Sequence, residues 1–430
     1  MNMKICVIGL GYIGLPTAAI FAKAGFNVLG VDVNENAVNL INKGEVHLEE
    51  VGLPEVVKEV VDSGNLRASL NVEEADVYII SVPTPIHKDY TANVDYVVSA
   101  TESILPFIKK GNVVIVESTI PPRTIDDVVA PIFEKTELNV KEDIYLAHCP
   151  ERVLPGRILI ELVENTRIVG GYTKESAYQA AEVYRQIVKG EVIETQAVTA
   201  EMSKLMENTY RDVNIALANE LGKISAKLGI NALDVITLAN RHPRVNIHTP
   251  GPGVGGHCLA VDPYFIIEKA PELSPLISNA RKINNSMPNF VLECVQNTVN
   301  KGAKIAVLGL TYKGNIDDVR ESPAMEIVSL LSENEFELSI HDPHVTEDQV
   351  NFPLNTFEDA ILNAECILVL TDHKEFKELN EKSILQNMKK PLIFDTKNCV
   401  RITNKSIAYY NYNNVFEMKN QKENLELISK

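Results

Sequence analysis

The sequence contains the same eleven-residue pattern twice. Residues 4–14 read KICVIGLGYIG and residues 304–314 read KIAVLGLTYKG, at an offset of 300 positions (304 minus 4). Each copy is an apolar strand followed by a glycine-rich turn of the kind that leads into a helix in a parallel α/β sheet. The repeat therefore predicts two related α/β halves within one chain.

The first copy has the pattern of a dinucleotide site. Gly9, Gly11 and Gly14 follow the strand predicted at 5–8, and Asp32 ends the next strand, eighteen residues after Gly14. Glycines at this spacing let the backbone approach a pyrophosphate, and an acidic side chain at the second strand binds a ribose hydroxyl. A carboxylate there repels the extra phosphate of NADP, so the pattern favours NAD. The weaker alternative is a tight turn in another α/β fold.

The second copy departs from this pattern at two positions. Thr311 stands where the first copy has Gly11, and Lys313 stands where it has Ile13. The glycine that admits a pyrophosphate is lost while a cation is gained. We therefore interpret the second half as a modified nucleotide-phosphate site.

The remaining pattern predicts an α/β fold with two Rossmann-like, doubly wound parallel-sheet domains joined by a long central helix. A single helix is expected at 198–228, where apolar residues recur at helical spacing without proline, and it offers a dimer surface. Lys204 and Asn208 lie one turn apart on one face of it. The expected domains are 1–197, 198–300 and 301–415, with a tail at 416–430; everything from about residue 405 is interpreted as peripheral. The predicted strands are 27–31, 77–82, 113–116, 144–147 and 167–169, then 337–341, 366–370 and 391–394.

Composition limits the classes of function. The chain of 430 residues is 45% hydrophobic and 23% charged, with a net charge of −17 that is spread along it, which argues against a surface for nucleic acid or anionic membrane. The N-terminus runs directly into a strand and no apolar run has membrane-spanning length, so a cytoplasmic protein is expected. The six cysteines lack metal or disulfide spacing, and three histidines near Cys258 lack zinc spacing, so reduced thiols and no metal are expected.

Residues 251–262 read GPGVGGHCLAVD and place Cys258 in a loop of small residues. A thiol beside a nicotinamide can trap an aldehyde as a hemithioacetal, which permits a second hydride transfer and carries an alcohol to an acid. Such a thiol needs a nearby cation or helix N-terminus to be a useful nucleophile, and Lys204 could be that cation. A buried structural cysteine is the alternative.

Polar residues follow three of the predicted strands. Thr84, Thr119 and the Glu151–Arg152 pair each come directly after a strand, where ligands bind in open α/β sheets. Each could also be an ordinary polar loop. Glu151 is either a solvated carboxylate or a base that acts on water.

Seven ordered motifs between residues 4 and about 400 resemble the UDP-glucose/GDP-mannose dehydrogenase family. This resemblance implies oxidation of the C6 hydroxymethyl group of a nucleotide sugar to a carboxylate by two NAD, in uronic acid and polysaccharide biosynthesis. The motifs are GLGYIGLP at 9–16, VPTP at 82–85, EST at 117–119, KLMENTYRDVNIALANE at 204–220, GPGVGGHCLAVDPYF at 251–265, GLTYKGNIDDVRESPA at 309–324 and FDTKN at 394–398.

The resemblance also implies the catalytic roles. Cys258 would be the nucleophile that forms a thiohemiacetal and then a thioester. Lys204 would act as general acid and base and, with Asn208, stabilise the oxyanion. Asp262 and Thr119 would hold or activate water, and Glu151 would assist hydrolysis of the thioester.

Binding roles follow from the same resemblance. The coenzyme would be held by Gly9, Gly11, Tyr12, Ile13, Gly14, Asp32, Thr84, Thr119 and Arg320. The nucleotide sugar would be held by Arg152, Val153, Lys204, Asn208, Arg211, His242, Arg244, Gly255, Tyr312, Lys313 and Lys397, with UDP on the last three. The loop 241–244 would lie near the site of a partner subunit, so a homodimer or a higher homo-oligomer is expected.

Departures from the family pattern indicate the sugar. Ala260 and Val261 replace a Pro-Lys pair, and Cys149 replaces the asparagine of an Asn-Pro-Glu motif, which is similar to the branch that acts on N-acetylated sugars. Residues 239–247, ANRHPRVNI, resemble the enzymes that use UDP-N-acetylmannosamine. UDP-N-acetylglucosamine is the alternative substrate. A two-electron hydroxyacid dehydrogenase and a catalytically silent NAD-binding regulator are the alternatives from other classes.

Overall fold

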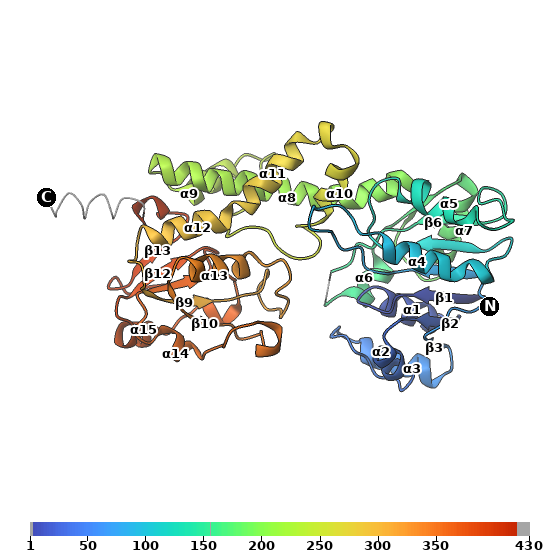
Figure 1. The fold of residues 1–430 in the computed structure, drawn as a ribbon, viewed down its shortest axis with the longest axis horizontal. Coiled ribbons are helices and arrows are strands. Elements are labelled where there is room, and N and C mark those ends of the chain that lie inside the picture. Colours follow the sequence, from blue (N-terminus) through green and yellow to red (C-terminus); the bar gives the residue numbers. More distant parts are fainter. Residues whose placement is uncertain (1–2, 155, 419–430) are drawn as a thin grey trace. The chain divides into compact units, whose positions relative to one another are not determined.

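The computed structural model describes residues 3–154 and 156–418. The chain forms two compact units (Figure 1). The first comprises residues 1–207 with 264–271, and the second comprises 208–263 with 272–430.

The first unit is built on an eight-stranded sheet with the order β3-β2-β1-β4-β5-β6-β7-β8. Six strands, from β3 to β6, are parallel, and the strand order reverses direction between β1 and β4, where doubly wound folds bind their ligands. The strands are β1 Lys4–Ile8, β2 Asn27–Val31, β3 Leu66–Ser69, β4 Val77–Ile80, β5 Val113–Val116, β6 Tyr145–His148, β7 Arg167–Gly171 and β8 Val192–Gln196.

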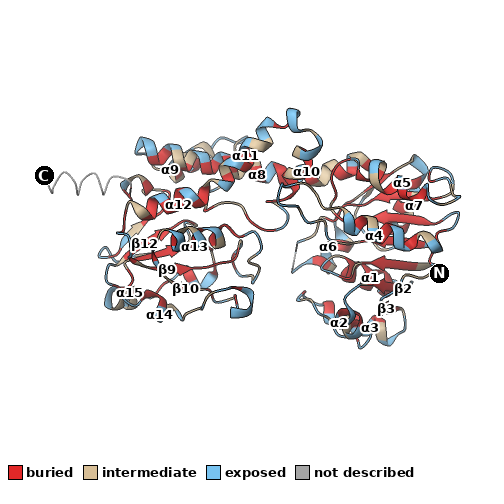
Figure 2. Cartoon of the chain, in the orientation of Figure 1, coloured by how far each residue is buried: buried red, intermediate tan, exposed pale blue. Residues whose placement is uncertain are grey.

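Helices cover both faces of this sheet, and its central strands are buried between them (Figure 2). Alternate residues of the central strands supply the two cores. Ile5 and Val7 of β1 pack with α1, α3 and α7, whereas Cys6 and Ile8 pack with α4, η2 and α5. This alternation follows from the period of two in a strand. The helices are α1 Gly14–Lys23, α2 Glu35–Ile41, α3 Leu53–Asp62, α4 Asp95–Ile104, η1 Leu105–Phe107, η2 Ile125–Val129, α5 Ala130–Phe133, α6 Ile158–Glu164 and α7 Lys174–Arg185.

The long central helix predicted from the apolar spacing is confirmed as α8, Ala197–Leu228. It is followed by α9 Ala232–Ala239, α10 Asp262–Lys269, η3 Pro271–Leu273, α11 Pro275–Asn285 and α12 Met287–Gln296. Within the second unit, the buried Arg281 guanidinium on α11 lies 2.6 Å from Asp212 on α8. Asn284 also donates to Asp212, so two buried polar contacts connect α11 with α8.

A second sheet, with the order β10-β9-β11-β12-β13, completes the second unit, and all of its strand pairs are parallel. Ile305 and Val307 face one core and Ala306 and Leu308 face the other. Its elements are β9 Lys304–Leu308, α13 Pro323–Glu333, β10 Glu337–His341, η4 Glu347–Gln349, α14 Phe357–Ile361, β11 Cys366–Val369, η5 Lys374–Phe376, α15 Glu381–Asn387, β12 Leu392–Asp395 and β13 Ala408–Tyr410. The predicted fold class, two doubly wound α/β sheets with a helical region, is confirmed.

Several local expectations are wrong. Strands β3, β8 and β13 were not predicted, and β7 pairs antiparallel with β6, so the first sheet is not parallel throughout. The second copy of the repeat does not lead directly into a helix. Residues 311–320 form a loop, and α13 begins only at Pro323, where the Ser322 side chain accepts the amide hydrogen of Ala324 as a cap.

The segment after residue 405 is not peripheral as far as it is described. Ala408–Tyr410 forms the edge strand β13, and Tyr412, Val415 and Met418 are completely buried in the core of the second sheet. The expected tail therefore belongs to the folded unit up to Met418. Residues 419–430, the rest of that tail, lie outside the described residues.

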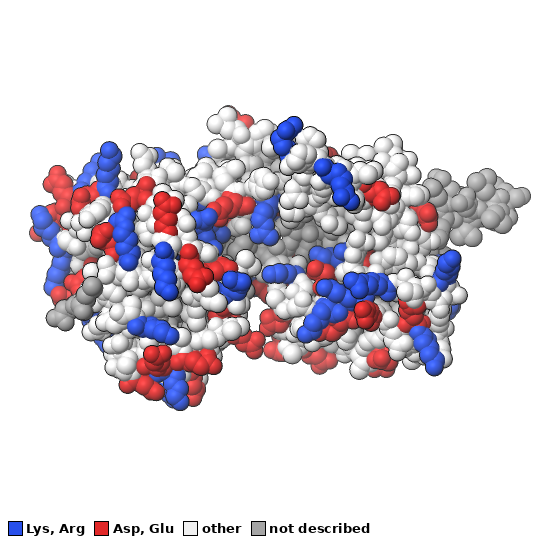
Figure 3. Space-filling view, turned by 180° about the vertical axis from the view of Figure 1, so that it is seen from behind, with Lys and Arg blue, Asp and Glu red and all other residues white. Residues whose placement is uncertain are grey.

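The charged side chains do not gather by sign on the face drawn in Figure 3, where Lys and Arg are interspersed with Asp and Glu. Within the described residues, no helix is both long enough and apolar enough to span a membrane.

Candidate active site

The three glycines of the first motif serve different purposes. A Cβ on Gly14 would lie 1.8 Å from the carbonyl oxygen of Gly9, and a Cβ on Gly9, whose φ is +90°, would lie 2.5 Å from the carbonyl oxygen of Ser81. A Cβ on Gly11 would meet nothing within 4 Å. Gly9 and Gly14 are therefore required by packing, whereas Gly11 keeps a space open above the backbone at the start of α1. That open space beside a helix N-terminus fits a dinucleotide pyrophosphate.

Asp32 directly follows β2 and lies next to this turn, and its carboxylate is oriented by the backbone. One oxygen accepts the amide hydrogen of Leu10 at 2.8 Å, and the other accepts that of Asn34 at 2.8 Å. A carboxylate has about four acceptor positions, so capacity remains for ribose hydroxyls. The neighbouring Val33 is 96% exposed and offers no cation for a 2′-phosphate, which agrees with the preference for NAD.

The loops after β4 and β5 are tied together by Ser118. Its hydroxyl accepts from the Val82 amide at 2.9 Å and donates to the Val82 carbonyl at 2.7 Å. Thr84 and Thr119 lie on these two loops, and the buried Thr84 hydroxyl has no hydrogen-bond partner among the described residues. A buried donor without a partner is costly, so this hydroxyl is suited to a ligand.

Glu151 and Arg152 follow β6, and both make strong contacts within the first unit. The Glu151 carboxylate accepts the Arg152 amide at 2.6 Å and the Arg167 guanidinium at 2.7 Å. The Arg152 guanidinium lies 2.6 Å from Glu207 of α8 and is one-third exposed, and Val153 is half-buried. Glu151 is thus a buried, doubly anchored carboxylate rather than a solvated loop residue.

Lys204 and Asn208 lie on α8 one turn apart, as predicted, and the boundary between the two units falls between them. Lys204 is half-buried and forms no hydrogen bond or ion pair with a described residue of its own unit. Asn208 is buried and donates to the Asp262 carboxylate at 2.6 Å. The structure therefore brings Asn208 and Asp262 together, and Arg211 lies exposed on the same helix.

The glycine loop that leads to Cys258 is packed tightly within the second unit. A Cβ on Gly255 would lie 2.3 Å from the Glu321 carbonyl oxygen, and a Cβ on Gly256 would lie 2.8 Å from the Tyr312 ring. Cys258 itself is exposed, and its carbonyl oxygen accepts the amide hydrogen of Asp262 at 2.9 Å. The alternative of a buried structural cysteine is therefore wrong.

The start of that loop is held by side chains that sequence reasoning missed. The buried Asn219 of α8 accepts the Gly251 amide hydrogen at 2.8 Å, and Tyr412 donates its hydroxyl to the Gly251 carbonyl at 2.9 Å. Tyr412 comes from the segment that the sequence suggested to be peripheral. The start of the loop is therefore fixed by the core of its own unit.

The predicted UDP residues lie around the loop after β9 and the end of β12. Tyr312 is half-buried against Gly256, and Lys313 is exposed. Lys397 lies 3.6 Å from Asp372. Arg320 is bound to Asp318 at 2.6 Å and approaches the His257 ring at 3.3 Å, which places its guanidinium beside the residue before Cys258.

The second copy of the repeat has closed its dinucleotide site. Thr311 is buried and its hydroxyl donates to the Lys313 carbonyl at 2.8 Å, so a side chain occupies the turn that is open at Gly11. Asp342 accepts the amide hydrogen of Leu310 at 2.7 Å, just as Asp32 accepts that of Leu10. The Asp342 carboxylate is buried, however, and the Nε2 atom of His373 lies 3.2 Å from it. A ribose could not reach this carboxylate.

The loop that carries His242 and Arg244 projects from the second unit. Asn240 closes it by bonding both the amide and the carbonyl of Ile247. His242 and Arg244 are both exposed in the chain, and the Arg244 amide donates to the His242 ring at 3.4 Å.

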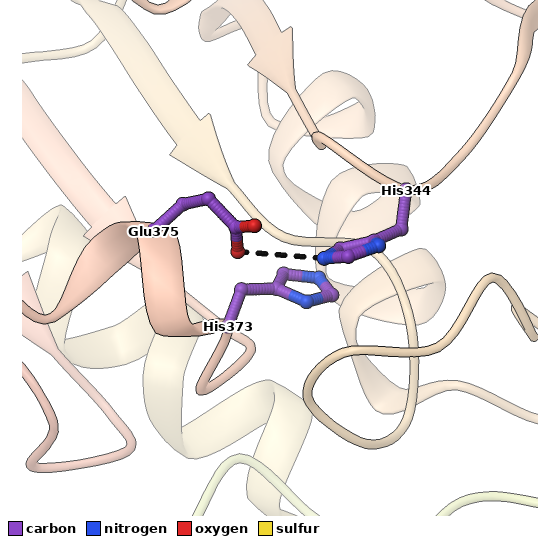
Figure 4. A group of neighbouring side chains, drawn as sticks. All are labelled: His344, His373 and Glu375. Atoms are coloured by element: carbon purple, nitrogen blue, oxygen red, sulfur yellow. Dashed lines mark hydrogen bonds and ion pairs between the residues drawn. The ribbon is translucent and has the colours of Figure 1, made fainter. Parts of the chain in front are cut away.

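The described residues contain one group with the spacing of a metal site, His344, His373 and Glu375, whose ligand atoms lie within 4.8 Å of one another (Figure 4). The Nδ1 atom of His373 accepts the Asn315 amide hydrogen at 2.9 Å, so Nε2 carries the proton and donates to Asp342. Both nitrogens are committed, and a metal needs a lone pair. His344 and Glu375 form an ordinary pair at 3.4 Å.

A buried cluster around Glu117 was not predicted from the sequence. Its carboxylate is fully buried and accepts from Tyr184 at 2.7 Å and from Ser81 at 2.8 Å. The Arg167 guanidinium lies 4.0 Å from Glu117 and 2.7 Å from Glu151. Burial raises the pKa of Glu117, although Arg167 lowers it. A charged residue at the head of an apolar strand is the only sequence signal that could have indicated Arg167.

A buried histidine at the end of β6 makes the first unit sensitive to acid. Burial lowers the pKa of His148 to about 4 from 6.5. Between pH 6.5 and pH 4 the unfolded chain binds a proton that the folded chain does not, so stability is lost as the pH falls through this window. We expect a loss of about 3 kcal/mol. Urea-dependent hydrogen exchange of β5 and β6 in the wild type and in His148→Asn, which keeps the donor to Val116, measures it. Equal pH dependence in the two proteins would contradict this assignment.

Comparisons with known proteins agree with the fold and the motifs. Models of the UDP-glucose/GDP-mannose dehydrogenase family match residues 3–188 (NAD binding domain), 198–286 (central domain) and 306–402 (UDP binding domain). The chain therefore belongs to this family. It is a NAD-dependent nucleotide-sugar dehydrogenase, as the resemblance predicted.

Individual relatives carry a more specific name. A UDP-N-acetyl-D-mannosamine dehydrogenase of Methanococcus maripaludis strain C7 is 50% identical over 406 residues, which cover 92% of each chain. The solved UDP-N-acetyl-mannosamine dehydrogenase Cap5O of Staphylococcus aureus is 53% identical, with a TM-score of 0.87 over 96% of this chain and 99% of that one. A UDP-D-ManNAc dehydrogenase structure from Pyrococcus horikoshii is 41% identical, with a TM-score of 0.89 over 96% and 100%.

Proposed function

We propose that this chain oxidises the C6 hydroxymethyl group of UDP-N-acetyl-D-mannosamine to a carboxylate in two successive NAD-dependent steps. The observation that carries the choice of sugar is the 50% identity, over 92% of both chains, with a relative of that name. The solved relatives named for the same sugar support it. The exposed Cys258 thiol supports a four-electron rather than a two-electron reaction.

The first unit supplies the coenzyme site. Gly11 leaves room for the pyrophosphate at the start of α1, Asp32 accepts the ribose hydroxyls, and the Thr84 hydroxyl finds a partner on the ligand. When bound, NAD accepts one hydride in each oxidation, so two equivalents are used per sugar nucleotide. Arg320 binds the pyrophosphate of the coenzyme. The proposed coenzyme site also includes Gly9, Tyr12, Ile13, Gly14 and Thr119.

Cys258 carries the substrate between the two oxidations. Lys204 removes the C6 hydroxyl proton in the first step, and the thiolate of Cys258 then adds to the aldehyde carbon to give a thiohemiacetal. The second oxidation leaves a thioester. Water hydrolyses it, releasing the carboxylate and restoring the thiol. Covalent retention explains why the aldehyde does not escape between steps.

Asn208 and Asp262 act as one unit in this scheme. Asn208 gives one amide hydrogen to Asp262 at 2.6 Å and keeps the second for the oxyanion of the tetrahedral intermediate, which Lys204 also stabilises. Asp262, fixed by this bond, holds water together with Thr119. Glu151 assists the hydrolysis by accepting the proton of the attacking water.

The nucleotide sugar is held by the second unit and by the loop after β6. Tyr312, Lys313 and Lys397 bind the UDP, and Gly255 contributes the backbone of the loop that packs against Tyr312. Donors for the sugar, its acetamido group and the new acid come from Arg152, Val153, Lys204, Asn208, Arg211, His242 and Arg244.

Helix α8 supports a homodimer. Tyr210, Leu217, Ile224 and Leu228 are 61%, 51%, 47% and 65% exposed, and they recur every four or seven residues along one stripe of the helix. An apolar stripe of this kind favours a second copy of the chain. A Leu217→Glu, Ile224→Lys double variant should sediment as a monomer and lose activity, because the exposed 241–244 loop would no longer meet a partner. An active monomer would contradict this proposal.

The substrate assignment is tested by direct comparison. Purified protein is incubated with NAD and either UDP-N-acetylmannosamine or UDP-N-acetylglucosamine, and NADH absorbance is followed with the product mass. We expect two NADH per sugar nucleotide consumed, and a kcat/KM for the mannosamine substrate at least about 100-fold higher. A yield of one NADH per sugar nucleotide would contradict the thioester mechanism. A higher kcat/KM for UDP-N-acetylglucosamine would contradict the assignment of the mannosamine substrate.

A further inference from the structure

The ion pair between Arg167 and Glu151 connects the first unit's core with one of the proposed catalytic residues. Arg167 heads β7 and is 5% exposed, and Glu151 follows β6 and is 7% exposed. The Arg167 Nη1 atom lies 2.7 Å from Oε2 of Glu151, while Oε1 of Glu151 accepts the Arg152 amide at 2.6 Å. Each carboxylate oxygen therefore has one fixed donor and one remaining acceptor position.

Arg167 is itself immobilised by groups that do not touch Glu151. Its guanidinium carbon lies 5.1 Å from the centre of the Tyr184 ring, and Nη1 lies 4.0 Å from Glu117. Glu117 is in turn held by the hydroxyls of Tyr184 and Ser81. The guanidinium is thus held in one position in the core. Its ion pair with Glu151 restrains the orientation of that carboxylate in turn.

A buried ion pair is a poor means of gaining stability, because the cost of removing two charges from water often exceeds their attraction. Charge-assisted hydrogen bonds, in contrast, are short and directional, so two donors fix the orientation of a carboxylate. The arrangement is therefore better explained by a requirement on the orientation of Glu151.

We propose that Arg167 is a positioning residue for hydrolysis of the Cys258 thioester. It holds the Glu151 carboxylate in the orientation that accepts a proton from the attacking water. The water oxygen bonds to the thioester carbon, its proton passes to Glu151, and the carbon–sulfur bond breaks with the electron pair leaving on Cys258. This inference rests on the proposed function, because it assigns a residue to one of its steps.

Arg167→Lys is the primary test variant, because it keeps a buried charge near the two carboxylates but loses the planar guanidinium that lies over the Tyr184 ring and places Nη1 on Glu151. Rapid mixing with NAD and UDP-N-acetylmannosamine should still give a burst of close to two NADH per active site. The steady rate that follows should be about tenfold lower or less, with an acyl group on Cys258 detected by mass spectrometry. Hydroxylamine, which cleaves thioesters to hydroxamates, should restore turnover.

Tyr78→Phe is the matched control. It removes a buried tyrosine hydroxyl from the same unit, one that accepts the Ala75 amide hydrogen at 2.9 Å and, among the described residues, forms no hydrogen bond with Glu117, Arg167 or Glu151. This variant should show a lower thermal midpoint but no acyl accumulation and no response to hydroxylamine. Glu151→Gln should reproduce the burst, the accumulation and the rescue of Arg167→Lys more strongly.

Two outcomes would overturn the role of Arg167 while leaving the proposed function intact. One is that Arg167→Lys lowers the burst amplitude and the steady rate by the same factor relative to the wild type and that no acyl group is detected on Cys258. The other is the same accumulation in Tyr78→Phe. Failure of the proposed function has a different signature, in which wild type, Glu151→Gln and Arg167→Lys all release one NADH per sugar and never carry an acyl group.

Discussion

Cys258→Ala is expected to abolish formation of the acid while the protein remains folded. The thiol is exposed, so its removal opens no cavity, and the loop is held by Asn219 and Tyr412 rather than by the sulfur. Without the nucleophile the aldehyde cannot be converted to a thioester. We expect acid production to fall by at least about 10³-fold, as is usual when a covalent nucleophile is deleted. Product analysis by mass spectrometry measures it.

Two further variants make this result specific. Cys258→Ser keeps the size of the side chain but replaces the thiol by a much weaker nucleophile, so it should behave nearly as the alanine variant does. Cys399→Ser removes a partly exposed thiol from the same unit and should leave acid formation unchanged. Acid formed at the wild-type rate by Cys258→Ala would require another nucleophile.

The parts of the fold that follow from local periodicity could be predicted from the sequence. The central strands are continuous apolar runs because both of their faces are buried, and α8 combines helical spacing with the absence of proline. Strands β3, β8 and β13 were not predicted because they are short or partly exposed edge strands with few hydrophobic residues. Their place is decided by pairing with a neighbour rather than by their own residues.

Contacts between distant residues could not be predicted. The Glu117–Arg167–Glu151 cluster depends on β7 lying beside β6, and β7 runs antiparallel to that strand, which no local pattern indicates. The burial of the Tyr412 side chain could not be predicted for a related reason. The segment around it is rich in asparagine and tyrosine, a composition typical of surface loops, yet Tyr412 is completely buried and bonds to Gly251.

The residues of the candidate site illustrate the same division. The motif spacing identified Gly11, Asp32 and Cys258 individually, because each has a chemical property that its position requires. The Asn208–Asp262 bond, which joins residues 54 positions apart, came only from the structure. The two copies of the repeat combine sequence and structural information. The replacement of Gly11 by Thr311 indicates that the second copy has lost its pyrophosphate site, and the structure places the Thr311 side chain in that turn.

Gly11→Thr is expected to abolish tight binding of NAD without harming the fold. A Cβ at Gly11 meets no atom within 4 Å, and the second half of the chain already carries threonine at the matching position, Thr311, inside a well-packed unit. The new side chain would occupy the space through which the pyrophosphate approaches the backbone. We expect the Kd for NAD to rise by at least about 100-fold, equivalent to roughly 2.8 kcal/mol. Calorimetric titration with NAD measures it.

Gly14→Ala in the same motif should behave in the opposite way. Its Cβ would stand 1.8 Å from the Gly9 carbonyl oxygen, so the strand and helix would have to separate, and the thermal midpoint should fall even without ligand. Saturating NAD should raise the midpoint of the wild type by mass action but leave that of Gly11→Thr unchanged. Normal NAD affinity in Gly11→Thr would mean that the open space above this glycine is not where the coenzyme lies.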